Sequence, residues 1–338
     1  MKAPTHLLVA NPTAQSGRNA ARIDRALAEL RASGLHARLL PTDPGGRTSR
    51  AVGEALAREP LRCVVAMGGD GTFREVAEGL LDSGRADEVA LGMLPAGTAN
   101  NHGRAFGLRA GDAALAGNAR IVAAGRETRL DAGRLHLVDA AGATVWRGAF
   151  FDSVGWGIGA AVIAARNSER GGALGSIARD KLLYGAALLR ALASARPGGA
   201  DVVASISVNR GPSQERRLAE LLIRGTRVYA GGWVVDPAAR HDDGAFEVFS
   251  FPSRAGWVAR AAAGLSLGPL VLAGLVAPAA PPDTQRASFV EVELRVAPGG
   301  ATPACQLDGE EMPPCARASI EVVPRALRVI VPAAFADR

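Results

Sequence analysis

Lysine is nearly missing from this sequence, and aromatic residues and cysteines are few. Lys2 and Lys181 are the only lysines in 338 residues, so arginine supplies nearly all the positive charge behind the formal net charge of +6. This charge has two readings: a general compositional bias toward Ala, Gly and Arg, or attraction to anionic phosphates or an anionic bilayer surface. Since no basic run is interleaved with aromatic residues, nucleic acid is a poor candidate as a partner.

Three cysteines cannot form a closed set of disulfides, and none has the spacing of metal ligands. The apolar run Leu7–Ala10 is too short for the core of a signal peptide, so we expect a reduced, cytoplasmic protein. The uncharged stretch Ala261–Pro282 is about long enough to span a bilayer. Its glycines and prolines favour a buried or interfacial pair of helices over a membrane span.

Hydrophobic periodicity divides the chain into two parts. Strands and helices alternate in the first part, which predicts a parallel sheet between helical layers. Strand-like runs follow one another from about residue 129, and the apolar–polar alternation of FVEVELRV (289–296) is the clearest of them. We therefore expect an α/β protein: a three-layer parallel-sheet domain over residues 1–128, then a mostly antiparallel, β-sandwich-like domain over residues 129–338. The last strands are free to return to the first domain, and a nucleotide cleft is expected between the two.

The expected elements are as follows. In the first domain, the strands are 6–10, 35–40, 61–67 and 88–94, and the helices are 18–32, 49–57, one that begins at Thr72, and 98–106. In the second domain, the strands are 129–138, 144–151, 201–209, 217–224, 245–251, 289–296, 318–323 and 327–331, and the helices are 177–195 and 257–276.

A cluster of three glycines surrounds one carboxylate after the third strand, in VVAMGGDGTFREV (64–76). The glycines allow positive φ and let a bulky anion approach the backbone amides. Thr72 and Glu75 have the spacing of a capping box, which predicts that a helix begins at Thr72 with its free N–H groups toward the loop. This arrangement binds phosphate. Since Asp70 would repel a bare phosphate, we expect a divalent cation or a network that positions one.

The loop is not one of the common phosphate motifs, because the Walker A lysine is missing and no G-x-G-x-x-G follows the first strand. Two further polar loops, NPTAQSG (11–17) and LPAGTANN (94–101), follow the first and fourth strands, with Thr98 as the expected helix cap. The carboxyl ends of parallel strands meet at one edge of a sheet. The three loops therefore predict a crevice for a polyphosphate nucleotide.

In this order, the three loops resemble those of the diacylglycerol kinase catalytic-domain family, which includes soluble bacterial lipid kinases and sphingosine kinases. The later blocks RLDAGRL (129–135), GGWVVDPAARHDDGAFEV (231–248) and LDGEEM (307–312) are similar to family blocks too, so the resemblance covers nearly the whole chain. NAD kinases are more distant relatives that share the GGDG loop, and the late acidic motif separates this chain from them. The resemblance implies an ATP-dependent kinase of lipid metabolism and phospholipid biosynthesis, acting on a diacylglycerol-like or sphingoid hydroxyl.

The resemblance also implies roles for individual residues. Asp70 and Asp131 match carboxylates of the family's metal network, and Glu310 matches its general base, with Glu311 as the rival. Magnesium is expected on the carbonyls of Arg240 and Ala245 and the carboxylate of Asp243. The implied ATP contacts are Asn11, Pro12, Thr13, Ala14, Gln15, Thr42, Gly68, Gly69, Asp70, Gly71, Thr72, Phe73, Arg74 and Thr98.

Two departures from the family pattern keep alternatives open. Arg74 stands where the family usually has Asn, and Asn101 stands where it usually has Asp. The alternatives are a soluble-substrate kinase of the NAD-kinase kind and a nucleotide-binding regulator that has lost catalysis. The partner expected from the resemblance is a lipid at the inner membrane surface, where the protein would be peripheral, and a homodimer is left open. The stretches 155–165 and 261–276 either line an apolar lipid pocket or are ordinary core helices.

Overall fold

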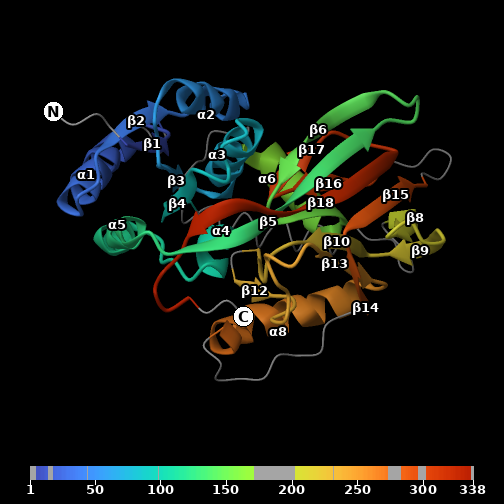
Figure 1. Cartoon of the computed structure of the whole chain (residues 1–338). Coiled ribbons are helices and arrows are strands. Elements are labelled where there is room, and N and C mark those ends of the chain that lie inside the picture. Colours follow the sequence, from blue (N-terminus) through green and yellow to red (C-terminus); the bar gives the residue numbers. More distant parts are fainter. Residues whose placement is uncertain are drawn as a thin grey trace. The chain divides into compact units, whose positions relative to one another are not determined.

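The computed structural model describes residues 5–13, 18–43, 45–97, 99–170, 202–230, 232–272, 283–295 and 302–335 (Figure 1). The chain divides into two compact units, one of Met1–Asp131 with Arg325–Arg338 and the other of Ala132–Pro324. Two long strands, β5 (Glu127–Val138) and β18 (Arg317–Ile330), contribute residues to both units. The expected helix over 177–195 lies outside the described residues.

The first unit contains a parallel sheet with the strand order β2-β1-β3-β4-β18. Its first four strands are β1 (His6–Ala10), β2 (Ala37–Pro41), β3 (Cys63–Gly68) and β4 (Ala90–Pro95). Ala10 pairs with Met67, and Met67 pairs with Leu94, so β1, β3 and β4 end at the same edge. The parallel sheet expected from the alternating periodicity is confirmed.

Helices cover both faces of this sheet (Figure 1). On one face, α1 (Arg18–Ala32) and α5 (Leu115–Ala124) bury Ile23, Leu30 and Val122 against the strands. On the other face lie α2 (Arg47–Arg58) and α3 (Asp70–Asp82), which pack together. A short helix, α4 (Asn101–Ala105), follows β4, and a 3-10 turn, η2 (Asp112–Ala114), precedes α5. The sequence analysis missed α5, whose glycine and asparagine weaken its helical signal.

The second unit is a sandwich of two sheets. A six-stranded sheet has the order β14-β13-β10-β7-β16-β17, and the sheet facing it contains β18-β15-β8-β9 with β5 and β6. Val154 and Trp156 from the first sheet share one buried cluster with Val290 and Val292 from the second. The strands are β6 (Thr144–Phe150), β7 (Ser153–Gly157), β8 (Val202–Val208), β9 (Gln214–Leu218), β10 (Glu220–Arg224), β13 (Phe246–Phe251), β14 (Asp283–Ala287), β15 (Phe289–Leu294), β16 (Cys305–Leu307) and β17 (Glu310–Met312).

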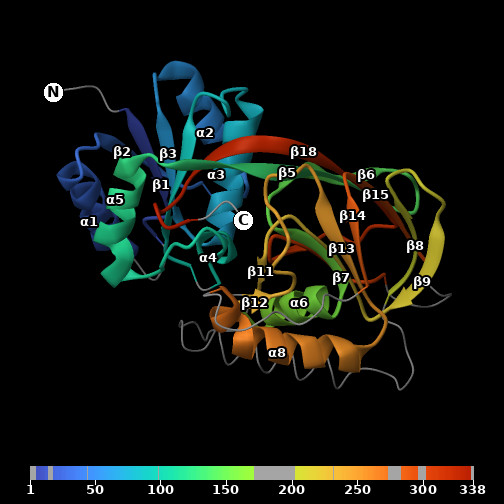
Figure 2. The same ribbon diagram turned by 60° about the horizontal axis from the view of Figure 1, so that its bottom comes forward.

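Two helices cover the outer face of the six-stranded sheet (Figure 2). They are α6 (Ile158–Arg170) and α8 (Arg254–Leu272), and Val162 and Trp257 from them join one buried cluster with Phe249 of the sheet. A small ribbon, β11 (Val228–Tyr229) with β12 (Trp233–Val234), contributes to the same cluster. No helix among the described residues has the length and apolarity needed to cross a membrane.

Several expected elements are corrected by the structure. The strand expected over 217–224 is two strands in different sheets, because the chain turns at Ala219 and β9 pairs with β8 while β10 pairs with β13. The strands expected over 318–323 and 327–331 are one strand, β18, whose first half is antiparallel to β15 and whose second half is parallel to β4. Pro324 gave the sequence signal of a break, and the structure accommodates it with a positive φ at Arg325 without ending the strand.

The stretch 155–165 is not one helix. Its first residues end strand β7, and α6 begins only at Ile158. Trp156 lies in the core between the sheets, whereas Ile158 and Val162 lie in the cluster under the helices. The short strands β7, β16 and β17 were missed because runs of three to five residues carry too little periodicity to predict.

Candidate active site

Loops that follow neighbouring strands of the first unit meet at the carboxyl edge of the parallel sheet. The β3–α3 loop and the β4–α4 loop are joined by backbone hydrogen bonds, because the N–H groups of Ala96 and Gly97 donate to the Gly68 carbonyl at 2.8 and 3.1 Å. Asn11 follows β1, and the Thr42 N–H after β2 donates to the Ala10 carbonyl at 2.9 Å. The structure therefore brings the sequence-predicted loops to a single edge.

The glycines of this edge allow close backbone approach, not a left-handed backbone. Gly69 has a φ of −93°, and none of Gly68, Gly69 and Gly71 uses the positive φ that glycine allows. A Cβ atom on Gly97 would lie 2.4 Å from the Cα of Gly69, so no side chain fits between the two loops. A Cβ on Gly68 would lie 2.3 Å from the Thr72 hydroxyl. The two loops can touch only because these positions carry no side chain.

The helix after this loop begins earlier than expected. It starts at Asp70 with Gly69 as its N-cap, and no side chain caps it, so the capping box of Thr72 and Glu75 is wrong. Thr72 instead lies within the first turn and packs against Gly68. The carboxylate of Asp70 thus sits at the positive end of the α3 dipole, where a negative charge is stabilised.

Asp70 is held by the neighbouring loop. The backbone N–H and the ring Nδ1 of His102 each lie 3.2 Å from its Oδ1. Burial disfavours the charged form, but hydrogen bonds and charge from His102, together with the Asn101 and His102 backbone N–H groups, outweigh it and lower the pKa of Asp70. The His102 ring is 1% exposed and stacks on Phe73 with centroids 4.0 Å apart. Asp70 is therefore an oriented carboxylate that stays ionised at neutral pH.

Asn100 and His102 were missed by the sequence analysis, which expected a polar loop over 94–101 and a helix capped by Thr98, whereas α4 begins at Asn101 with Asn100 as its N-cap. Asn100 has a φ of 51°, accepts a hydrogen bond from the Gly97 N–H at 2.8 Å and donates to the Gly97 carbonyl at 2.6 Å. This pair of bonds closes the loop beside Gly69. A consecutive Asn-Asn-His after a glycine turn was the available signal, because asparagine adopts positive φ more readily than most residues.

The other expected nucleotide residues have different surroundings. Asn11 accepts hydrogen bonds from the Thr13 N–H and hydroxyl at 2.9 and 2.8 Å, which shapes the β1 loop. Phe73 is 3% exposed and its ring is stacked on His102, and Arg74 lies 3.9 Å from Glu78 one helical turn on. Pro12 lies in the turn after β1, between Asn11 and Thr13. Ala14, Gln15 and Thr98 lie outside the described residues.

Asp131 is fully buried on β5, and its Oδ1 accepts the Arg325 N–H at 2.6 Å. Arg325 has a φ of 52°, so this bond fixes an unusual backbone conformation in the middle of β18. This contact gives Asp131 a structural task. Its expected place in a metal network stays a prediction.

The expected magnesium residues lie in a turn before β13 in the second unit. Asp243 pairs with the Arg286 guanidinium, and its Oδ1 accepts the Ala245 N–H at 3.2 Å. Glu247 is 3% exposed, and its Oε2 has no hydrogen-bond partner in the described part of the chain. Burial raises the pKa of Glu247 to about 8, and the charges of Asp236 and Asp243 add to the effect.

The residues expected to hold magnesium offer the oxygen ligands that this hard cation prefers. They are one carboxylate and two backbone carbonyls, and the Asp243 carboxylate is at the same time paired with Arg286. No group of three or more His, Cys, Asp or Glu side chains among the described residues is arranged to hold a metal. An ion at this turn would therefore depend on the backbone carbonyls of Arg240 and Ala245 as much as on Asp243, and the magnesium site stays a prediction.

Glu310 and Glu311 point to opposite faces of a hairpin. Strands β16 and β17 pair Leu307 with Glu310 and Gln306 with Glu311, and consecutive strand residues face opposite sides. The Asn167 side chain on α6 donates to Glu311 at 3.2 Å. Glu311 is thus turned toward α6, and Glu310 lies on the other side of the hairpin.

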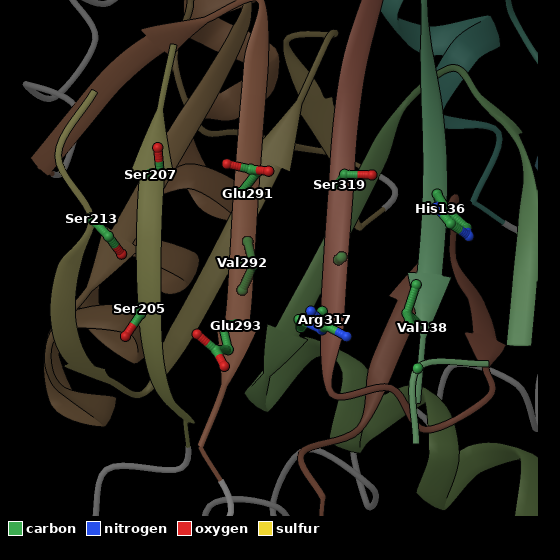
Figure 3. Close-up of a pocket in the computed structure, with 12 residues that line it drawn as sticks. His136, Val138, Ser205, Ser207, Ser213, Glu291, Val292, Glu293, Arg317 and Ser319 are labelled. Atoms are coloured by element: carbon green, nitrogen blue, oxygen red, sulfur yellow. The ribbon is translucent and has the colours of Figure 1, made fainter. Parts of the chain in front are cut away.

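A groove of about 480 Å³ on the second unit contains none of the predicted site residues (Figure 3). It lies on the outward face of the strands β8, β15, β18 and β5, where Glu291 and Glu293 are exposed between buried valines, as the period-2 pattern predicted. Serines, glutamates and Arg317 line it. A lipid tail requires an apolar lining, so this groove is unsuited to one.

Comparison with known proteins gives the family. A model described as the diacylglycerol kinase catalytic domain matches residues 5–135, and one described as the YegS C-terminal NAD kinase beta sandwich-like domain matches residues 152–331. The chain belongs to the YegS-like diacylglycerol kinase family. The order of the two matches follows the order of the parallel sheet and the sandwich along the chain.

Curated relatives of the family match part of the chain. The "Probable lipid kinase YegS-like" of Klebsiella pneumoniae is 33% identical over 133 residues, 39% of this chain and 42% of the relative. The diacylglycerol kinase of Bacillus subtilis is 33% identical over 129 residues, 35% of this chain and 40% of the relative. Each match thus spans less than half the length of the relative.

Solved structures share the fold. A diacylglycerol kinase of Bacillus anthracis strain Sterne has a TM-score of 0.63 at 15% identity, covering 99% of this chain and 100% of that chain. Yeast NADH kinase complexed with NADH has a TM-score of 0.51 at 9% identity, covering 98% of this chain and 85% of that chain. At these identities the likeness concerns the fold alone.

Proposed function

We propose that this protein is an ATP-dependent lipid kinase that phosphorylates a hydroxyl of a diacylglycerol-like or sphingoid lipid. The observation that carries the proposal is the edge built around Asp70, where glycine loops from β3 and β4 touch and a helix N-terminus is open to phosphate. The family supports phosphoryl transfer as the reaction type. Peripheral association with the inner membrane surface belongs to the same proposal, because the acceptor resides in a bilayer.

The roles follow from the chemistry of phosphoryl transfer, which needs positioning and charge neutralisation more than covalent catalysis. Backbone N–H groups of the three loops bind the nucleotide phosphates. The acceptor oxygen bonds to the γ-phosphorus as the bridging P–O bond to ADP breaks, and Glu310 takes the hydroxyl proton. Glu310 fits this task better than Glu311, since Glu311 is turned toward Asn167.

Magnesium belongs to the proposal as well. The carbonyls of Arg240 and Ala245 and the carboxylate of Asp243 would hold one ion, and Asp70, with Asp131, would orient the ion that accompanies ATP. The chemistry that a bound magnesium ion supplies is neutralisation of phosphate charge. The low pKa of Asp70 suits it to this role, because the carboxylate is ionised at neutral pH.

The test is transfer of labelled γ-phosphate to vesicles that contain diacylglycerol, a sphingoid base or neither, with anionic and zwitterionic carrier lipids compared. Wild-type protein should label an acceptor lipid, and Glu310→Gln should reduce turnover by about 10²-fold or more while ATP still binds, since a positioned general base contributes about that much. Full activity of Glu310→Gln would refute the assignment of the base.

The assay also separates the two alternatives. Phosphorylation of NAD in the absence of lipid would show that the acceptor is a soluble molecule and not a lipid. ATP binding with no transfer to lipid or NAD would favour a regulator, which the amide of Asn101 in place of the usual carboxylate motivates.

A further inference from the structure

The hairpin that carries Glu310 has a tight turn with an unusual aspartate. Asp308 and Gly309 are the two residues between the paired Leu307 and Glu310, and their φ values are 49° and 83°. Two consecutive positive φ values define a type I′ turn, whose twist matches that of the strands it joins. Glu310 therefore follows directly on this tight turn.

Turn aspartates generally face solvent, but Asp308 does not. It is 2% exposed, and its carboxylate accepts three consecutive backbone N–H groups at the start of β7. Oδ2 accepts from Phe151 at 3.0 Å, and Oδ1 accepts from Asp152 at 2.8 Å and from Ser153 at 2.9 Å. Its own N–H donates to the Ser153 carbonyl at 2.8 Å. The turn is thus clamped to a strand more than 150 residues earlier in the chain.

Gln306 supplies a second clamp on the same turn. Its side-chain carbonyl accepts the Gly309 N–H at 3.0 Å, and its amide donates to the Ser153 hydroxyl at 3.2 Å. Gln306 has no solvent exposure. Both residues on the inner side of the turn therefore bind Ser153, and buried hydrogen bonds of this kind restrict motion because an unpaired buried group is costly.

β7 is in turn fixed by a buried ion pair. The Arg224 guanidinium donates to Asp152 at 2.8 Å, and both side chains are at most 1% exposed. The Thr226 hydroxyl also donates to the Asp152 carboxylate at 2.5 Å. The clamp from Asp308 consequently ends on a rigid segment in the core of the unit.

We propose that Asp308, completed by Gln306, is a positioning residue that holds Glu310 in the geometry needed to accept the acceptor proton. This inference rests on the proposed function and assigns a task to a residue that touches neither ATP nor the acceptor. The carboxylate fixes the turn, the turn fixes the first residue of β17, and that residue is Glu310.

The test is Asp308→Asn, alone and in the Glu310→Gln background. Asparagine keeps the shape but places an amide donor against the Phe151 N–H. We expect kcat for lipid phosphorylation to fall about tenfold or more, a share of the roughly 10²–10⁴-fold effect of a general base, with KM for ATP within about twofold of wild type. In the Glu310→Gln background, Asp308→Asn should cause no further loss, because it acts through Glu310.

Asp139→Asn is the matched control. Asp139 is also a hairpin-turn aspartate of this unit, and its Oδ1 accepts the Ala141 and Ala143 N–H groups at 2.9 and 2.8 Å. Its turn carries no proposed site residue, so kcat should match wild type. A merely structural role for Asp308 would lower the melting temperature and add its loss to that of Glu310→Gln, which would overturn the inference.

Gln306→Met keeps the test open if Asp308→Asn does not fold. It removes both hydrogen bonds of the second clamp, and a smaller loss of kcat that vanishes in the Glu310→Gln background is expected. Unchanged kcat in a folded Asp308→Asn or Gln306→Met variant contradicts the inference. Inactive wild-type protein refutes the proposed function instead, and a fully active Glu310→Gln variant refutes the assignment of the base, so the failures are distinguishable.

Discussion

Single residues at the edge of the parallel sheet meet a steric demand. Gly69 and Gly97 stand where the backbones of two loops touch, and neither requires a positive φ. Asp70 uses this contact, because His102 reaches its carboxylate only while the two loops stay together. These glycines are needed because they have no side chain, and adding a single Cβ atom at each position measures the effect.

We expect Gly97→Ala to weaken ATP binding by about tenfold or more, because its Cβ would lie 2.4 Å from the Gly69 Cα and backbone cannot yield as a side chain does. The measurement is ATP affinity by calorimetry. Gly117→Ala is the control, since its Cβ meets nothing within 4 Å inside α5. The control should bind ATP normally and gain about 0.5–1 kcal/mol of stability. Equal ATP affinity of the two variants would contradict the steric argument.

Among the elements, helices α2 and α3 pack unusually closely on one face of the first unit. A Cβ on Gly79 of α3 would lie 2.3 Å from the Ser49 carbonyl oxygen and 2.9 Å from the Val52 Cβ. Since α3 begins at Asp70, the way it packs on α2 also sets the direction of its N-terminus. A packing contact about two and a half turns away thereby supports the sheet edge around Asp70.

We expect Gly79→Ala to lower the free energy of unfolding by about 1–3 kcal/mol, because overpacking forces the helices apart. Urea unfolding monitored by circular dichroism measures it. Gly53→Ala on the facing helix is the matched control, because its Cβ would be 3.7 Å from the Gly79 carbonyl oxygen, an ordinary contact. That variant should be neutral or more stable. A stabilised Gly79→Ala would show that the helices separate without cost.

On the scale of the whole molecule, the first unit is discontinuous in sequence. Residues 325–338 belong to it, although almost 200 residues of the other unit intervene. Leu327 and Val329 of β18 are 0% exposed, and the Arg328 guanidinium binds Glu127 and the carbonyls of Asp87 and Glu88. The second half of β18 thus completes the parallel sheet of the first unit.

We expect a fragment of residues 1–131 to be unstable alone and to be rescued by fusing residues 325–338 to it through a flexible linker. Each fully buried aliphatic side chain of the missing strand contributes about 1.5–3 kcal/mol, against a total stability of about 5–15 kcal/mol. Cooperative thermal unfolding of the two fragments gives the answer. A fragment 1–131 that unfolds as cooperatively as the fusion would show that the last strand is dispensable.

The sequence by itself determined the fold class and the strands that end at the carboxyl edge of the parallel sheet. The buried runs of β1, β3 and β4 and the alternation in β15 are local patterns, and the physical reason is that burial on one or both faces fixes periodicity directly. Asp70 was recognisable for a similar reason, since a lone carboxylate among glycines directly after a buried strand is a local pattern.

Only the tertiary structure decided which partners hold the site residues. His102 on Asp70, Arg325 on Asp131 and Asp308 on the start of β7 join residues 32 to 194 positions apart. Such bonds leave no local pattern, because hydrogen bonding depends on distance in space and periodicity only on distance along the chain. For the same reason, the sequence pointed to the glycines, but the close contact between two loops that requires them became visible only in three dimensions.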